Sequence, residues 1–110
     1  MGSCQVAYAF QSQWQDGFVA NLTIRNTGST AINGWTLTWT FPGNQRITNL
    51  WNANWTQTGQ AVTTSNNADW NRVIAAGGQY TFGFQATYSG TNGRPTAFQL
   101  NNSGCAVAQA

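Results

Sequence analysis

Three stretches of the chain alternate apolar and polar side chains with a period of two, and this alternation is the strongest constraint on the fold. The stretches are residues 18–25, 35–41 and 80–87. Such a pattern predicts strands that are buried on one side and exposed on the other. Shorter strand candidates are residues 5–10, 45–51, 60–65, 72–74 and 96–100.

Turn signals follow one another at short intervals between these candidates. Among them are an Asp-Gly pair at 16–17, an Asn-Gly pair at 33–34 and a Gly-Gly pair at 77–78, while TQTGQ at 56–60 predicts a hairpin. No segment keeps helical spacing over more than two turns, and 110 residues fit one domain. We therefore predict an all-β fold, a single β-sandwich of about eight or nine antiparallel strands.

The composition favours an uncharged partner. Only 5% of the residues are charged, against roughly 25% in an average soluble domain. The polar surface must then consist of Asn, Gln, Thr and Ser, which suits a ligand rich in hydroxyl groups. The four arginines are scattered and lysine is absent, so the clustered cations of a nucleic-acid-binding surface are missing. No stretch has the length and apolar character of a membrane span.

Most catalytic chemistry lacks its residues in this chain. Histidine is absent, which removes Ser-His-Asp and Cys-His schemes and most transition-metal sites. One enzymatic alternative remains, because Asp16 and Asp69 could act as the carboxylate pair of a glycosidase. The chain has no third acid that could adjust the pKa of either carboxylate. Asp16 is also explained as the first residue of an Asp-Gly turn. We expect no enzyme activity, no metal and no cofactor.

The two cysteines, Cys4 and Cys105, lie near the two ends of the chain. In an oxidising compartment a disulfide between them would close nearly the whole domain into one loop. The alternative is two unrelated free thiols. Two cysteines flanking a hydrophobic domain indicate a secreted, extracellular protein.

The six tryptophans fall into two groups by their neighbours. Trp35 and Trp39 lie on the apolar phase of a predicted strand and belong to the core. Trp14, Trp51 and Trp70 are surrounded by Gln, Asn and Asp near predicted turns, so we expect exposed rings there. The alternative is that some of them cap the ends of the sandwich. For Trp55 we favour partial burial.

Several motifs in combination resemble the bacterial family 2 carbohydrate-binding modules. They are the terminal cysteine pair, GWTL, three spaced tryptophans, AGG, FGF and PTAF, and they cover the chain from Cys4 to Cys105. The resemblance implies a sandwich of jelly-roll type that binds insoluble polysaccharide and is attached to a secreted cellulase, xylanase or related enzyme. It also implies that residues 4–105 form the module, with 1–3 an expression or leader remnant and 106–110 a tail or the start of a linker.

The resemblance implies a set of binding residues as well. Its flat row of tryptophans matches Trp14, Trp51 and Trp70, and its neighbouring polar residues match Asn21, Asn49 and Gln85, with Thr81 a weaker candidate. In the xylan-binding branch, an arginine at the position of Gly17 turns the ring of the first tryptophan out of the plane of the row. Gly17 and Trp51 together resemble the cellulose-binding branch (subfamily a). One extra residue before Trp14 and another before Trp70 depart from the family pattern.

We therefore expect a monomeric, non-catalytic module for crystalline cellulose, with no nucleic-acid or membrane partner. A module for xylan or for chitin is the first alternative, since Gly17 argues only against xylan. A non-binding structural or adhesive β-sandwich is the second alternative. It predicts that replacing the exposed tryptophans changes stability and leaves polysaccharide binding unaffected.

Overall fold

A computed structural model of the chain describes residues 4–66, 72–90, 93, 95, 97–101 and 103–109. Their regular structure is entirely β, which confirms the predicted class. The strands are β1 (Cys4–Trp14), β2 (Gly17–Asn26), β3 (Ile32–Asn33), β4 (Thr36–Thr40), β5 (Arg46–Trp51), β6 (Asn54–Thr58), β7 (Ala61–Ser65), β8 (Val73–Ile74), β9 (Gln79–Thr87), β10 (Phe98–Leu100) and β11 (Ser103–Gln109). No helix in the described residues is long and apolar enough to span a membrane.

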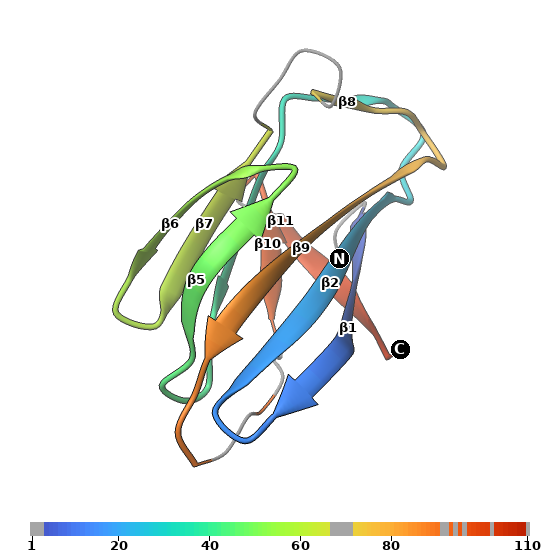
Figure 1. Cartoon of the computed structure of the whole chain (residues 1–110). Coiled ribbons are helices and arrows are strands. Elements are labelled where there is room, and N and C mark those ends of the chain that lie inside the picture. Colours follow the sequence, from blue (N-terminus) through green and yellow to red (C-terminus); the bar gives the residue numbers. More distant parts are fainter. Residues whose placement is uncertain are drawn as a thin grey trace.

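One large sheet folds into the two layers of the sandwich. Its strand order is β5-β9-β2-β1-β11-β10-β4-β7-β6, and β3 pairs with β8 separately. Figure 1 shows β5, β9, β2 and β1 side by side in one layer and β6 and β7 in the other. The apolar phases of the strands face each other between the layers, which confirms the sandwich.

The described residues contain eleven strands, more than the eight or nine expected. Three of these strands match no strand candidate in the sequence. Two of the three are β3, which is only two residues long, and β11, whose side chains are mostly small. The third, β6, lacks apolar alternation and was expected only as an arm of the hairpin that it forms with β7. Short or small-residue strands carry little period-two signal, so pattern alone misses them.

The expectation of a purely antiparallel sheet is wrong at one pair. β1 and β11 run parallel, with Gln5 opposite Ala106 and Tyr8 opposite Gln109. A parallel pair needs a long connection, and here the rest of the domain provides it. Residues 106–109, expected as a tail or linker, extend β11 along β1.

The predicted disulfide links Cys4 on β1 to Cys105 on β11. The bond therefore joins the first and last described strands at the place where the two layers meet.

Aromatic side chains dominate the core. Trp35 stacks on Phe82 with ring centroids 5.7 Å apart, and Trp39 stacks on Phe84 at 5.9 Å. Both indoles are buried, as predicted, and the contacts to β9 hold the two layers together. Trp55 is half-buried against the core, which confirms the favoured interpretation of this residue.

The side chain of Gln57 connects the two edge strands of the large sheet, β5 and β6. Its Oε1 accepts a hydrogen bond from the Ile47 backbone N–H at 2.8 Å, and its Nε2 donates to the Gln45 carbonyl at 2.8 Å. An amide side chain thus satisfies edge groups that would otherwise be unpaired. The bridge steadies β5, the strand that carries Asn49 and Trp51.

Candidate functional site

A β-bulge turns Trp14 out of the core. On β1, Val6 and Tyr8 are buried, and strict alternation would direct Trp14 inward as well. The pairing with β2 shifts between Phe10 and Ser12, so that Gln11 is an extra residue. The phase is inverted from there on, and the Trp14 side chain lies on the outer surface with 42% of its area exposed.

A second bulge does the same for Trp51. On β5 the pairing with β9 shifts between Ile47 and Asn49, which leaves Thr48 as the extra residue. The Thr48 hydroxyl donates to the Gln85 carbonyl at 3.1 Å. Leu50 then points inward, while Asn49 and Trp51 are exposed. Trp14 and Trp51 therefore each lie three positions after the extra residue of a bulge.

Glycines on the neighbouring strands lie directly beneath both rings. Trp14 is paired with Gly17, and Trp51 with Gly83. A Cβ built on Gly17 would be 2.5, 2.7 and 2.8 Å from three atoms of the Trp14 ring, and one on Gly83 would be 2.8 Å from two atoms of the Trp51 ring. The nearest atoms lie along the Nε1–Cζ2 edge of each indole, so each ring packs closely against its glycine. Trp14 and Trp51 still keep 42% and 36% of their area exposed.

Tyrosine hydroxyls fix the strand ends that carry the two rings. The Tyr88 hydroxyl donates to the Trp14 carbonyl at 3.0 Å, and the Tyr80 hydroxyl donates to the Asn52 carbonyl at 2.6 Å. Both tyrosines are half-buried and pack on the core, Tyr88 against Phe18 and Tyr80 against Trp35. The backbone under each exposed ring is therefore tied to the rigid interior.

Strand register places the two rings on adjacent strands. The Trp14 ring covers β2 at Gly17, and the Trp51 ring covers β9 at Gly83, opposite Asn21. Gly17 and Asn21 are four residues apart, so the rings are separated by roughly 13 Å along the strands and about 5 Å across them. We call the outer surface of β5, β9, β2 and β1 the tryptophan face.

The polar residues expected at the site lie on this face too. Asn49 is opposite Gln85, and both are exposed between the two rings. Asn21 is half-buried beside the Trp51 ring, and its Nδ2 donates to Gln11 Oε1 at 3.1 Å. Thr81 lies farther along β9, with its hydroxyl 3.0 Å from that of Thr23. Trp70 and Asp69 lie outside the described residues.

Some contributors to the face were not singled out from the sequence. Gly83 carried a signal, because a glycine within a strand often marks a close approach of another group. Gln11, which bonds Asn21, carried none. Asp16 lies in the turn after Trp14 and is the only carboxylate among the described residues. The described part of the chain contains no cluster of three or more potential metal-ligating side chains.

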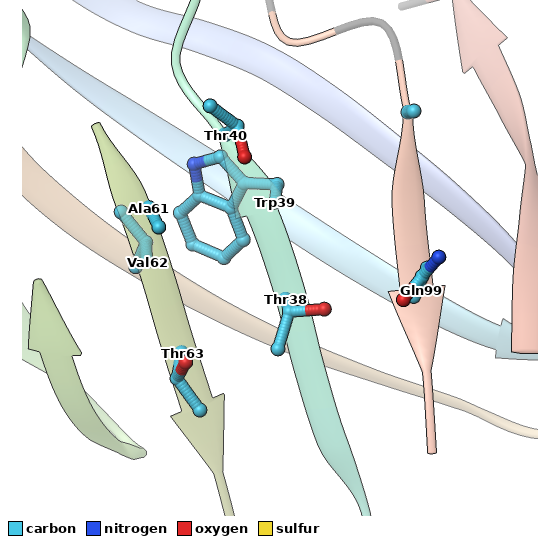
Figure 2. A pocket seen from close by; sticks show the side chains of 8 residues that line it. Thr38, Trp39, Thr40, Ala61, Val62, Thr63 and Gln99 are labelled. Atoms are coloured by element: carbon cyan, nitrogen blue, oxygen red, sulfur yellow. The ribbon is translucent and has the colours of Figure 1, made fainter. Parts of the chain in front are cut away.

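The opposite layer has a different surface. A shallow groove of about 500 Å³ lies over β4, β7 and β10. Figure 2 shows Thr38, Thr40, Thr63 and Gln99 among the side chains that line it. The only aromatic side chain lining it, Trp39, is 97% buried. Hydroxyl groups without an exposed ring offer no flat apolar area to a sugar, so the tryptophan face is the stronger candidate.

Comparison with known proteins identifies the family. The family model described as "Cellulose binding domain" matches residues 4–105. The chain belongs to this family. It is therefore a non-catalytic module, in agreement with the expectation that it is not an enzyme.

Relatives with this domain include polysaccharide-degrading enzymes. Exoglucanase A of Cellulomonas fimi is 43% identical over 106 residues, which cover 96% of this chain and 12% of that protein. The solution structure of the chitin-binding domain of Chi18aC from Streptomyces coelicolor matches with a TM-score of 0.73 and 33% identity over 94% of both chains. The cellulose-binding family 2 domain of ScLPMO10C matches with a TM-score of 0.66 and 34% identity, covering 84% of this chain and 89% of that one.

A side chain at position 83 should disturb the Trp51 ring. The Cβ of a Gly83→Val variant would lie 2.8 Å from that ring and 2.6 Å from Asn21 Oδ1, so the exposed ring must move off the strand. We expect about tenfold weaker adsorption to cellulose, or roughly 1.4 kcal/mol. Adsorption isotherms measure the loss, with Gly104→Val as the control because a Cβ at Gly104 meets nothing within 4 Å. Wild-type affinity in Gly83→Val would contradict this role of Gly83.

Proposed function

We propose that this domain adsorbs to the flat surface of crystalline cellulose through Trp14 and Trp51, with Trp70 as a third ring, and brings an attached secreted enzyme to its substrate. The observation that carries the proposal is the pair of exposed indoles packed against Gly17 and Gly83 on one outer surface. Their exposed apolar area is offered to a flat partner.

The chemistry of a pyranose ring fits this surface. Its faces consist of C–H groups and its edges of hydroxyls, so an indole covers the face while amides meet the edge as donors and acceptors. Asn49 and Gln85 are exposed between the rings and Asn21 lies beside Trp51, where they can bond such edges. Thr81, farther along β9, is the weaker candidate for the same role.

Rigidity suits a solid that cannot adapt its shape. The bulges, the glycines and the tyrosine hydroxyls hold both rings in place before binding, which lowers the ordering cost. If each ring removes about 100 Å² of apolar area from water, it contributes roughly 2.5 kcal/mol at ~25 cal/mol per Å².

The parent protein and its surroundings are inferred from relatives. Exoglucanase A is far longer than this chain, so we infer a covalently attached catalytic domain in the natural protein. Enzymes that degrade insoluble polysaccharide act outside the cell, which supports secretion, as does the disulfide. We further propose that the domain, residues 4–105, acts as a monomer without a nucleic-acid or membrane partner.

Chitin is a second candidate ligand, because one structural relative is named a chitin-binding domain. Chitin and cellulose both present flat sugar faces. Depletion of the domain from solution by crystalline cellulose, chitin and insoluble xylan ranks the three ligands. Strongest depletion by cellulose supports the proposal, and strongest depletion by chitin replaces cellulose with chitin. Depletion by none of them leaves a structural role.

Adsorption to cellulose should depend little on salt. The proposed contact joins neutral amides and indoles to neutral sugars, and screening acts on charges. We expect the dissociation constant to change by less than about twofold between about 20 mM and about 500 mM NaCl. Isotherms at both concentrations measure this, and a steep loss of affinity would mean that charge, not ring contact, drives adsorption.

A further inference from the structure

Arg46 introduces a positive charge at the border of the tryptophan face. It is the first residue of β5 and is exposed. Register places it opposite Thr87, which is itself opposite Gly17, the glycine under the Trp14 ring. Arg46 therefore lies two strands from that ring, a distance of roughly 10 Å across the sheet. An extended arginine side chain covers much of this gap.

The guanidinium has no competing partner in the described part of the chain. No described residue forms an ion pair or side-chain hydrogen bond with it. Asp16, the only described carboxylate, lies in the turn beyond Trp14 and forms no ion pair with Arg46. A neutral sugar needs only donors and acceptors, which the amides already supply, so a cation here suits a negatively charged group.

A polar hollow adjoins Arg46. It has a volume of about 350 Å³ and is lined by Gly43, Asn44, Gln45, Arg46, Gly59 and Gln60. Hydrogen bonds hold its walls: Gln60 Nε2 donates to the Gly43 carbonyl at 2.7 Å, and Asn44 Oδ1 accepts from the Ser89 N–H at 3.0 Å. Gln45 is buried and bonds Gly43 and Gly93. The hollow is thus a formed feature whose single charged side chain is Arg46.

We propose that Arg46 and this hollow form an accessory subsite for a uronic acid unit, a sugar whose edge carries a carboxylate in place of its hydroxymethyl group. The inference rests on the proposed function, because the sugar reaches the subsite when its chain lies across Trp14. The planar guanidinium binds a carboxylate through two parallel hydrogen bonds, and the hollow accommodates the edge group. Carboxylated glucan surfaces should then bind more tightly than neutral ones at low salt.

The effect should be modest, because the ion pair is exposed to solvent. We expect about two- to fivefold tighter adsorption to carboxylated cellulose than to the same unmodified cellulose at low salt. Added salt should remove the advantage, since screening weakens exposed charge pairs.

The test uses one crystalline cellulose before and after oxidation of its surface primary hydroxyls to carboxylates. Isotherms are measured at about 20 mM and about 500 mM NaCl for wild type, Arg46→Gln and Arg25→Gln. Arg25 is the matched control, because it is also exposed on β2, loses the same charge on substitution, and lies eight residues from Gly17 along the strand.

The expected result is that Arg46→Gln loses the low-salt preference while Arg25→Gln keeps it, with all three proteins binding unmodified cellulose alike. No preference in the wild type, or a preference that persists in Arg46→Gln, would overturn the subsite. An equal loss in both variants would attribute the preference to net charge and overturn it as well. Failure of the wild type to bind unmodified cellulose would instead reject the proposed function, and the subsite with it.

Discussion

Replacing both Trp14 and Trp51 by alanine is expected to weaken adsorption to crystalline cellulose by more than three orders of magnitude. Each ring contributes about 2.5 kcal/mol of apolar contact, so each single variant should lose about seventyfold. The rings are roughly 14 Å apart by strand register, and losses at sites that distant generally add. Depletion isotherms of the two single variants and the double variant measure the losses.

Stability should change only modestly in these variants. Both rings are partly exposed, at 42% and 36%, so their truncation should cost less of the free energy of unfolding than the loss of a buried ring, about 1 kcal/mol each. Trp39→Ala is the contrasting core variant, because its buried ring should cost about 3–5 kcal/mol of stability. Thermal unfolding separates the two classes. A double variant that unfolds much earlier yet still binds, as a structural role for the rings would predict, contradicts our account.

Removing the disulfide should produce the largest loss of stability. The bond joins residues 101 positions apart, and the chain-entropy model assigns a loop of about 100 residues roughly 4.7 kcal/mol. A Cys4→Ser/Cys105→Ser variant should therefore unfold at least about 15 °C earlier, since 1 kcal/mol corresponds to about 4–8 °C in a domain of this size.

Binding provides the control for that variant. The disulfide lies where β1 meets β11, and neither cysteine contributes to the tryptophan face. Well below its unfolding temperature the variant should therefore bind cellulose with wild-type affinity. A melting temperature within about 2 °C of wild type would show that strand pairing alone holds the chain ends together.

The sequence predicts much of the core of this domain. Alternating apolar residues on β2, β4 and β9 identified the buried phase, and Trp35 and Trp39 are where that phase placed them. The exposure of Trp14 and Trp51 followed from their polar neighbours. These inferences succeeded because each depends on residues adjacent in the chain.

Features that depend on distant residues could not be predicted in the same way. The bulges at Gln11 and Thr48 are defined by the pairing with β2 and β9, and β11 pairs with a strand about one hundred residues earlier. Gly83 shows its role only when the register places it under Trp51. The predicted face was thus a set of residue types, and the strand register supplies its geometry.

Hydroxyl-radical footprinting on crystalline cellulose tests the central claim, that the tryptophan face meets the polysaccharide. Indole side chains are oxidised readily, and Trp55 on β6, half-buried in the opposite layer, serves as the internal reference. Our account predicts that cellulose protects Trp14 and Trp51 strongly and leaves the oxidation of Trp55 unchanged. Protection of Trp55 with continued oxidation of Trp14 and Trp51 would contradict it and assign binding to the opposite layer.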